Sequence, residues 1–96
     1  MSIIEKIRDK IRSRDYFLSS HAEEEMIEDG FERSDVETAI LQGFIQTKLT
    51  HDPRGTRYRI EGLSNDNRLM HILCRLKETG SLIIITVYER NKLHEM

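Results

Sequence analysis

Histidine, arginine, tyrosine and threonine side chains are the residues of this chain that could carry out chemistry, and together they suit cleavage of a phosphodiester. RNA carries its own nucleophile, the 2′-OH. A protein that cleaves it supplies a base for that proton, an acid for the leaving 5′ oxygen and a cation for the phosphorane charge. Histidine is the usual acid or base near neutral pH, and arginine binds phosphate in a bidentate manner. The candidates on the predicted strands are His71, Thr86, Tyr88, Arg57, Arg59 and Arg75.

Each candidate also has an ordinary structural interpretation. A histidine on a strand, such as His71, is more often a satisfied, partly buried side chain than a catalyst. Strand arginines are often solvated or paired with acids on neighbouring strands, and Thr86 and Tyr88 are common strand residues. Cys74 is most simply a small core residue. The histidines show no metal-ligand spacing, so the sequence predicts no metal site and no cofactor.

His21 is placed by a predicted helix start. Ser20 fits an N-cap, and Glu23 three residues later completes a capping box. His21 then lies in the first helical turn, where unpaired N–H groups and the positive dipole end suit an anion such as phosphate. The alternative is that His21 is a solvated first-turn residue.

Helical periodicity marks the first half of the chain. Isoleucines at helical spacing predict a helix over 2–14. A second helix is predicted from about His21 to Asp29, ending at Gly30. A third follows a capping box at 34–37 and ends at Gly43. Residues 16–18 form a short apolar connection in this interpretation.

A period of two marks the second half, with strands predicted at 44–50, 56–62, 68–77 and 81–88. In the third of these, Met70, Ile72, Cys74 and Leu76 share the core face, and His71 and Arg75 point the other way. The prediction is an α+β fold, with N-terminal helices packed on one face of a four-stranded, antiparallel, curved sheet.

Length and composition indicate a single domain over residues 1–96, with an N-terminal helix in 1–15, a core over 17–90 and a polar tail at 91–96. The chain has no apolar run long enough for a transmembrane helix, no signal-like start and one cysteine, so we expect a cytoplasmic protein that is not membrane-bound. Its net charge is −2, with acids in excess over 1–43 and Lys and Arg in excess over 44–96.

Short matches in a consistent order resemble the small prokaryotic proteins grouped as domain of unknown function 4258. They are Ser20-His21-Ala22 with Met26, Gly30-Phe31, Ser34-Asp35-Val36, Ala39-Ile40, Gly43, Arg57-Tyr58, Arg68-Leu69-Met70-His71-Ile72 and Ile85-Thr86-Val87-Tyr88. The resemblance implies a barnase–EndoU–colicin–RelE-like superfold, whose members are mostly suspected metal-independent ribonucleases, often of toxin–antitoxin type. It implies RNA as substrate and a cognate antitoxin-like partner. Carried over by position, the active residues are His21, His71, Thr86 and Tyr88.

Two acidic residues depart from that pattern. Glu25 and Asp29 stand where the family pattern suggests arginine, and a carboxylate near a phosphate reverses the sign of the interaction. One hypothesis is therefore a metal-independent endoribonuclease in which Arg57, Arg59 or Arg75 holds phosphate. The alternative is a non-catalytic protein-interaction or RNA-binding module, such as a degenerate toxin, that pairs with a partner or forms a homodimer.

Overall fold

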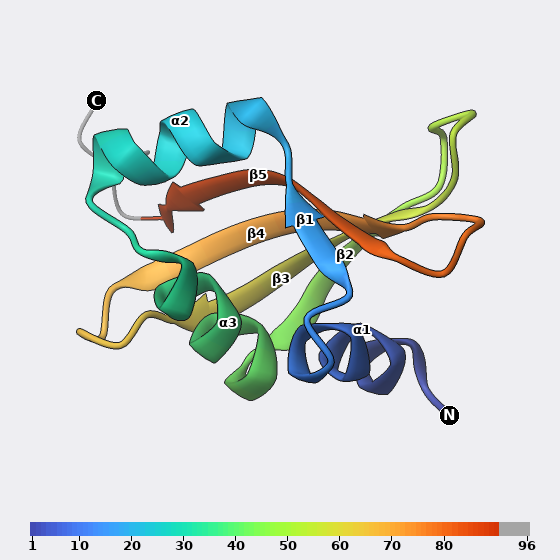
Figure 1. Cartoon of the computed structure of the whole chain (residues 1–96), viewed down its shortest axis with the longest axis horizontal. Helices are drawn as coiled ribbons and strands as arrows, with labels where there is room; N and C mark the ends of the chain where they lie inside the picture. Colours follow the sequence, from blue (N-terminus) through green and yellow to red (C-terminus); the bar gives the residue numbers. More distant parts are fainter. Residues whose placement is uncertain (91–96) are drawn as a thin grey trace.

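A computed structural model describes residues 1–90, which form three helices and a five-stranded mixed sheet (Figure 1). The predicted polar tail at residues 91–96 lies outside the described residues. The elements in chain order are α1 Ile3–Arg12, β1 Tyr16–Leu18, α2 Ser20–Asp29, α3 Arg33–Gln42, β2 Phe44–Leu49, β3 Arg57–Leu63, β4 Leu69–Leu76 and β5 Leu82–Glu89.

The sheet has the strand order β1-β5-β4-β3-β2. Strands β2 to β5 form the predicted antiparallel meander, but β1 adds a fifth strand that runs parallel to β5. The prediction of a four-stranded, wholly antiparallel sheet was wrong in this detail. Three residues are too few to show a period of two, and β1 is recognised only by its pairing of Tyr16 with Leu82 and Leu18 with Ile84.

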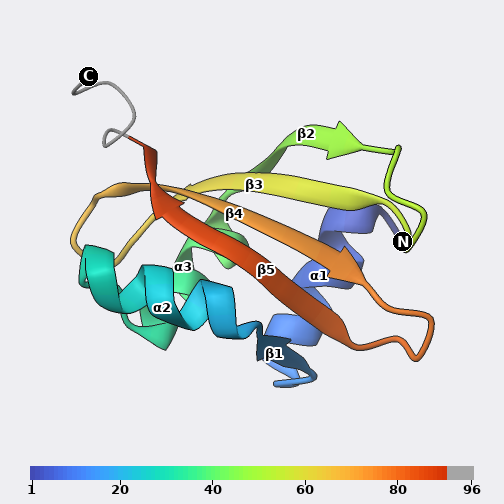
Figure 2. The same cartoon turned by 90° about the horizontal axis from the view of Figure 1, so that it is seen from above.

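The three helices pack against different parts of the structure (Figure 2). Helix α3 packs against β3 and β4, and α1 packs against α3, whereas α2 packs along β5. Gly62 permits the close approach of α3, because a Cβ atom there would lie 2.1 Å from the Ala39 carbonyl oxygen. The core combines Ile7, Ala22 and Ile40 from the helices with Ile60 and Ile72 from the strands.

The predicted core face of β4 is confirmed, since Met70, Ile72 and Cys74 are fully buried and Leu76 packs partly against the same core. The opposite face of the sheet, which carries the alternate residues of β3 and β4, is called the open face below.

The N-caps of α2 and α3 lie at other residues than those predicted from the sequence. Helix α2 begins after Ser19, whose Oγ accepts the N–H of Ala22 at 3.0 Å, and Ser20 is already helical. Helix α3 begins after Glu32, whose N–H donates to Asp35 Oδ2 at 2.8 Å, so the capping box at 34–37 was wrong. Adjacent serines and acids offer alternative caps, and tertiary contacts choose between them. Gly30 ends α2 at φ 72°, as predicted.

None of the helices within residues 1–90 is long and apolar enough to cross a membrane.

Candidate active site on the open sheet face

Strand register brings six of the seven predicted site residues to one face. On β4, His71 and Arg75 alternate with the buried residues, and the register places His71 opposite Tyr88, with Thr86 opposite Leu73. On β3, Arg59 pairs with Leu73 in that second row. Because side chains alternate along a strand, these residues and Arg57 face away from α3.

His71 is the centre of a hydrogen-bonded row across three strands. Its Nε2 lies 2.9 Å from Glu61 Oε1, and its Nδ1 lies 3.1 Å from the Tyr88 hydroxyl. The rings of His71 and Tyr88 meet edge to face at an interplanar angle of 74°. His71 is only 5% exposed, so packing and both hydrogen bonds hold its ring in place.

The two partners of His71 set the positions of its protons. An ionised Glu61 carboxylate only accepts, so Nε2 carries the hydrogen of a neutral imidazole and donates it to Glu61. Nδ1 then accepts the Tyr88 O–H. In this arrangement Glu61 orients the imidazole, and His71 in turn acts as a base toward Tyr88. Both ring nitrogens are engaged, so His71 reaches a substrate through Tyr88.

Glu61 is a functional candidate that sequence reasoning missed. Its alternation with Ile60 puts it on the arginine face of the strand, but nothing in the sequence tells that it pairs with His71. Phe44, the β2 partner of Glu61, is 55% exposed beside the same row.

Arg59 lies one row from His71 and keeps its charge. Its Nε donates to Gln46 Oε1 at 2.8 Å, and its Nη2 donates to Thr47 Oγ1 at 3.2 Å. Both acceptors are neutral, so they orient the guanidinium without neutralising it. Arg59 lies on β3, in the row that continues through Leu73 to Thr86 on β5, and such a cation suits a phosphate.

Arg57 and Arg75 lie farther along the face, at a pocket that Asp52 also lines. Asp52 Oδ2 is 3.4 Å from Arg57 Nε. The hydrogen bond from the Arg54 backbone N–H, more than the charges of the arginines, lowers the pKa of Asp52. Asp52 and Arg54 lie in the connection between β2 and β3 and were not among the predicted site residues.

The ion pair of His21 is with a residue of its own helix and not with the row of Glu61, His71 and Tyr88. Its side chain is exposed on α2, and its Nε2 lies 3.4 Å from Glu25 Oε1 in the same helix. The structure therefore brings His71, Thr86, Tyr88 and the arginines to one face, and places His21 on the helix that flanks β5.

Glu25 and Asp29 have a structural role that the sequence left open. Glu25 Oε1 accepts the backbone N–H of Val87 at 3.0 Å, and Asp29 Oδ2 accepts that of Glu89 at 3.2 Å. These N–H groups lie on β5 beyond the short pairing with β1, where a bare strand edge would otherwise be exposed. Arginine has no acceptor and could not make these bonds.

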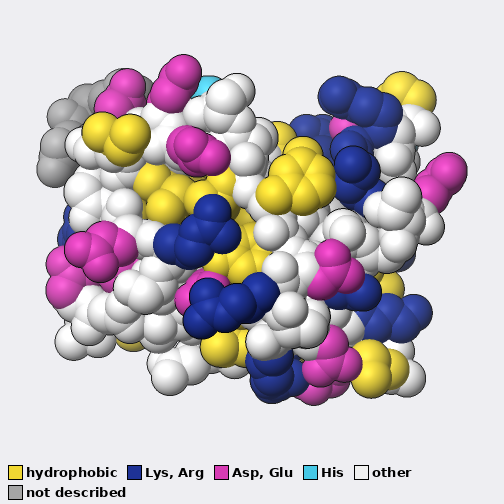
Figure 3. Space-filling model, viewed as in Figure 1, with side chains coloured by type: hydrophobic (Ala, Val, Ile, Leu, Met, Phe, Trp, Pro, Cys, Tyr) yellow, Lys and Arg dark blue, Asp and Glu magenta, His cyan; other side chains and the backbone are white. Residues whose placement is uncertain are grey.

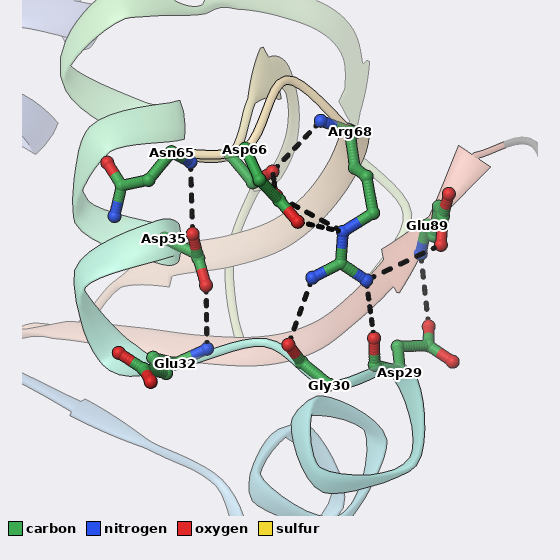
Figure 4. Close-up of polar contacts among 9 residues, drawn as sticks. Asp29, Gly30, Glu32, Asp35, Asn65, Asp66, Arg68 and Glu89 are labelled. Carbon is green, nitrogen blue, oxygen red and sulfur yellow. Dashed lines mark hydrogen bonds and ion pairs between the residues drawn. The ribbon is translucent and has the colours of Figure 1, made fainter.

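Arg68, one of the arginines of the basic half, joins α2 to the sheet (Figure 4). Its guanidinium donates to the carbonyls of Asp29 and Gly30 at 2.6 and 2.9 Å, at the C-terminal end of α2. It also lies 4.1 Å from the centre of the Phe31 ring and pairs with Asp66. Arg68 is thus committed to the fold and not to the open face.

The part of the chain that the structure describes has no site suited to metal binding or to thiol chemistry. Residues 1–90 contain no group of three His, Cys, Asp or Glu side chains that could hold a metal ion. Cys74 is fully buried, and burial raises the pKa of its thiol to about 12. What the open face offers is a hydroxyl backed by a base, with a cation one row away.

Comparisons with known proteins identify the sequence family of the chain and nothing finer. The family model described as "Domain of unknown function (DUF4258)" matches residues 18–89. Searches of the curated proteins and of the solved structures each gave no significant match.

Proposed function

This chain belongs to the DUF4258 family, and we propose that it is a toxin-like endoribonuclease that cleaves RNA by general acid–base catalysis without a metal ion. The observation that carries the proposal is the hydrogen-bonded row of Glu61, His71 and Tyr88 on the open face. In this row a carboxylate orients the imidazole, and the imidazole accepts a hydrogen bond from a hydroxyl. This places a base where it can take the proton of that hydroxyl, as acid–base catalysis requires.

Tyr88 is the catalytic residue in this proposal. As its oxygen takes the proton of the RNA 2′-OH, its own proton passes to His71 Nδ1, and the imidazolium is stabilised by Glu61. The 2′ oxygen attacks phosphorus to give a 2′,3′-cyclic phosphate. The bond to the 5′ oxygen breaks, and that oxygen takes a proton from water. The hydroxide that remains takes the proton back from His71 through Tyr88, which restores the neutral imidazole. Arg59, in the next row and two strands from Tyr88, would turn from Gln46 and Thr47 of β2 to stabilise the negative charge that builds on the phosphorane.

Tyr88→Phe tests the proposal most directly. The substitution removes the hydroxyl and keeps the ring that meets His71. We expect cleavage of a single-stranded RNA to fall by at least about 100-fold, the scale of one lost acid–base group. His71→Gln, which keeps an acceptor but takes up no proton, should cause a similar loss.

Tyr58→Phe is the matched control, because Tyr58 is a buried tyrosine on the core face of β3. It should cleave as the unaltered protein does. His21→Ala is a second comparison, and retention of activity would assign the chemistry to the His71 row alone. Full activity in both Tyr88→Phe and His71→Gln, with the fold intact by circular dichroism, would refute the proposal.

A second candidate is a non-catalytic RNA-binding or protein-interaction module. The burial of His71, with both ring nitrogens engaged, is also what a purely structural histidine shows. β2 pairs only with β3 and ends the sheet, so its outer edge offers a place for strand addition by an antitoxin-like protein or a second copy. No RNA cleavage by the purified protein, together with a dimer by light scattering, would favour this candidate.

A further inference from the structure

Lys and Arg side chains gather at one end of the molecule, around the β2–β3 and β4–β5 connections (Figure 3). We call this the basic end and define it by Arg54, Arg57, Arg75 and Lys77. These residues come from a loop, the start of β3 and the end of β4, so only the folded sheet brings them together. The cleavage chemistry proposed for the row of Glu61, His71 and Tyr88 uses none of these four residues.

The first hollow at the basic end has a volume of about 200 Å³. Ile83 and Ile85 of β5 give it an apolar part, and three arginines and one aspartate give it charged residues. Its lining residues are Ser19, Asp52, Arg54, Arg57, Arg75, Ile83 and Ile85. Three positive charges against one negative charge leave the hollow with a formal charge of +2, which suits an anion.

Asp52 does not neutralise its neighbours fully. Its Oδ1 accepts the backbone N–H of Arg54 at 2.9 Å, and its carboxylate oxygens lie 3.4 Å from the Nε atoms of Arg54 and Arg57. The Arg57 Nε is nevertheless buried without a hydrogen bond among the described residues. No ion pair within residues 1–90 joins Arg75 to a carboxylate.

A second hollow of about 420 Å³ lies beside the first and shares Arg54 and Arg75 with it. Lys77 and Glu78 of the β4–β5 connection complete its charges. Gly55 permits the shape of the loop beside the shared Arg75, because its φ of +127° is a backbone conformation that favours glycine. Two neighbouring cationic hollows with common arginines suit neighbouring phosphates of one chain better than a single ion.

We infer that the basic end binds the backbone of single-stranded RNA, with phosphates in both hollows; the choice of RNA rests on the proposed function. The first hollow includes Ile85, three residues before Tyr88 on β5, which is roughly 10 Å along a strand. One RNA strand can therefore lie against Tyr88 and continue into the hollows.

Binding of a labelled 2′-O-methyl RNA of about ten nucleotides, which has no 2′-OH to react, tests this inference by fluorescence anisotropy at several salt concentrations. The slope of log K against log salt concentration should fall by about 0.7 for each phosphate contact removed. Arg54→Gln combined with Arg75→Gln should therefore lower the slope by about 1.4 and weaken binding at every salt concentration.

Arg33→Gln is a control for the loss of one positive charge outside the basic end, since Arg33 is exposed on α3 and stacks over Tyr16. It should bind RNA as the unaltered protein does. Affinity and slope that stay unchanged in the Arg54/Arg75 variant would overturn the inference. So would polyglutamate that competes as well as RNA, because the basic end would then be a site for acidic proteins.

Different experiments would refute the ribonuclease proposal and the inference that the basic end binds RNA. Binding of the 2′-O-methyl RNA is measured without cleavage, so it tests the basic end whether or not the protein cleaves RNA. Salt-dependent binding through Arg54 and Arg75 without any cleavage would refute only the ribonuclease proposal. Cleavage that is unaffected by the loss of both arginines, together with unchanged binding, would refute only the inference about the basic end.

Discussion

Cys74 illustrates how position decides the chemistry of one side chain. It lies on the core face of β4, where it is fully buried between apolar neighbours. Burial disfavours the thiolate and raises the pKa of the thiol to about 12. The thiolate is the nucleophilic form of cysteine, so Cys74 is inert in the folded protein.

Thiol labelling checks this at the residue scale. At neutral pH we expect the folded protein to react with a chromogenic disulfide reagent at least about 1,000-fold more slowly than the protein unfolded in urea, because three pKa units separate a buried thiol near 12 from a free one. Rapid labelling of protein that stays folded by circular dichroism would contradict the burial of Cys74.

His71 and Tyr88 are the other side chains whose chemistry depends on neighbours. Neither the strand pattern nor the residue types show that Glu61 lies at the far nitrogen of His71. That third residue changes the interpretation of His71 from a base in contact with RNA to a base that acts through Tyr88.

Among the secondary-structure elements, helix α2 covers the exposed edge of β5 and makes hydrogen bonds to its backbone. Ser19 caps the helix and also donates its hydroxyl to the Ile85 carbonyl at 2.8 Å. Glu25 and Asp29 then accept β5 N–H groups along the helix. One helix thereby replaces the hydrogen bonds that a longer β1 would have made.

Ser19→Ala, compared with Ser20→Ala, tests this arrangement. Loss of the Ser19 cap and of its bond to Ile85 should lower the free energy of unfolding by about 1–2 kcal/mol. Ser20 is exposed and does not cap the helix, so its replacement should change stability by less than about 0.5 kcal/mol. Urea denaturation measures both. The opposite ranking would restore Ser20 as the cap.

At the scale of the whole molecule, the network around Arg68 joins segments that are distant in sequence. Arg68 follows the β3–β4 turn, contacts the end of α2 through Asp29 and Gly30, and lies 3.7 Å from Glu89 at the end of β5. The turn itself is tied to α3, because Asp35 accepts the N–H of Asn65 at 3.0 Å. These contacts close the end of the molecule opposite the basic end.

Arg68→Met should therefore destabilise the whole fold. The change keeps much of the apolar stem but leaves helix carbonyls without their charged donor, and we expect a loss of about 2–3 kcal/mol. Arg12→Met is the matched control, because Arg12 makes an exposed i,i+3 pair with Asp9 that contributes little. Thermal unfolding should show a lower Tm for Arg68→Met only. Equal Tm values would mean that the network adds no net stability.

Much of this fold follows from local patterns in the sequence. Helical spacing of isoleucines and alternation of apolar and polar residues depend only on backbone geometry, so α1 and β2 to β5 were predicted to within a residue or two. The same alternation determined that His71, Arg75, Thr86 and Tyr88 share a face once the strands pair in order.

Only the tertiary structure decided the features that depend on contacts between distant segments. β1 exists as a strand because β5 offers it an edge, and Ser19 is the cap because β5 also accepts its hydroxyl. Glu25 and Asp29 face unpaired N–H groups, which no local pattern reveals. The pairing of Glu61 with His71, and the grouping of arginines at the basic end, likewise require strands to be placed side by side, because hydrogen bonds and charges act over a few ångströms of space and not along the sequence.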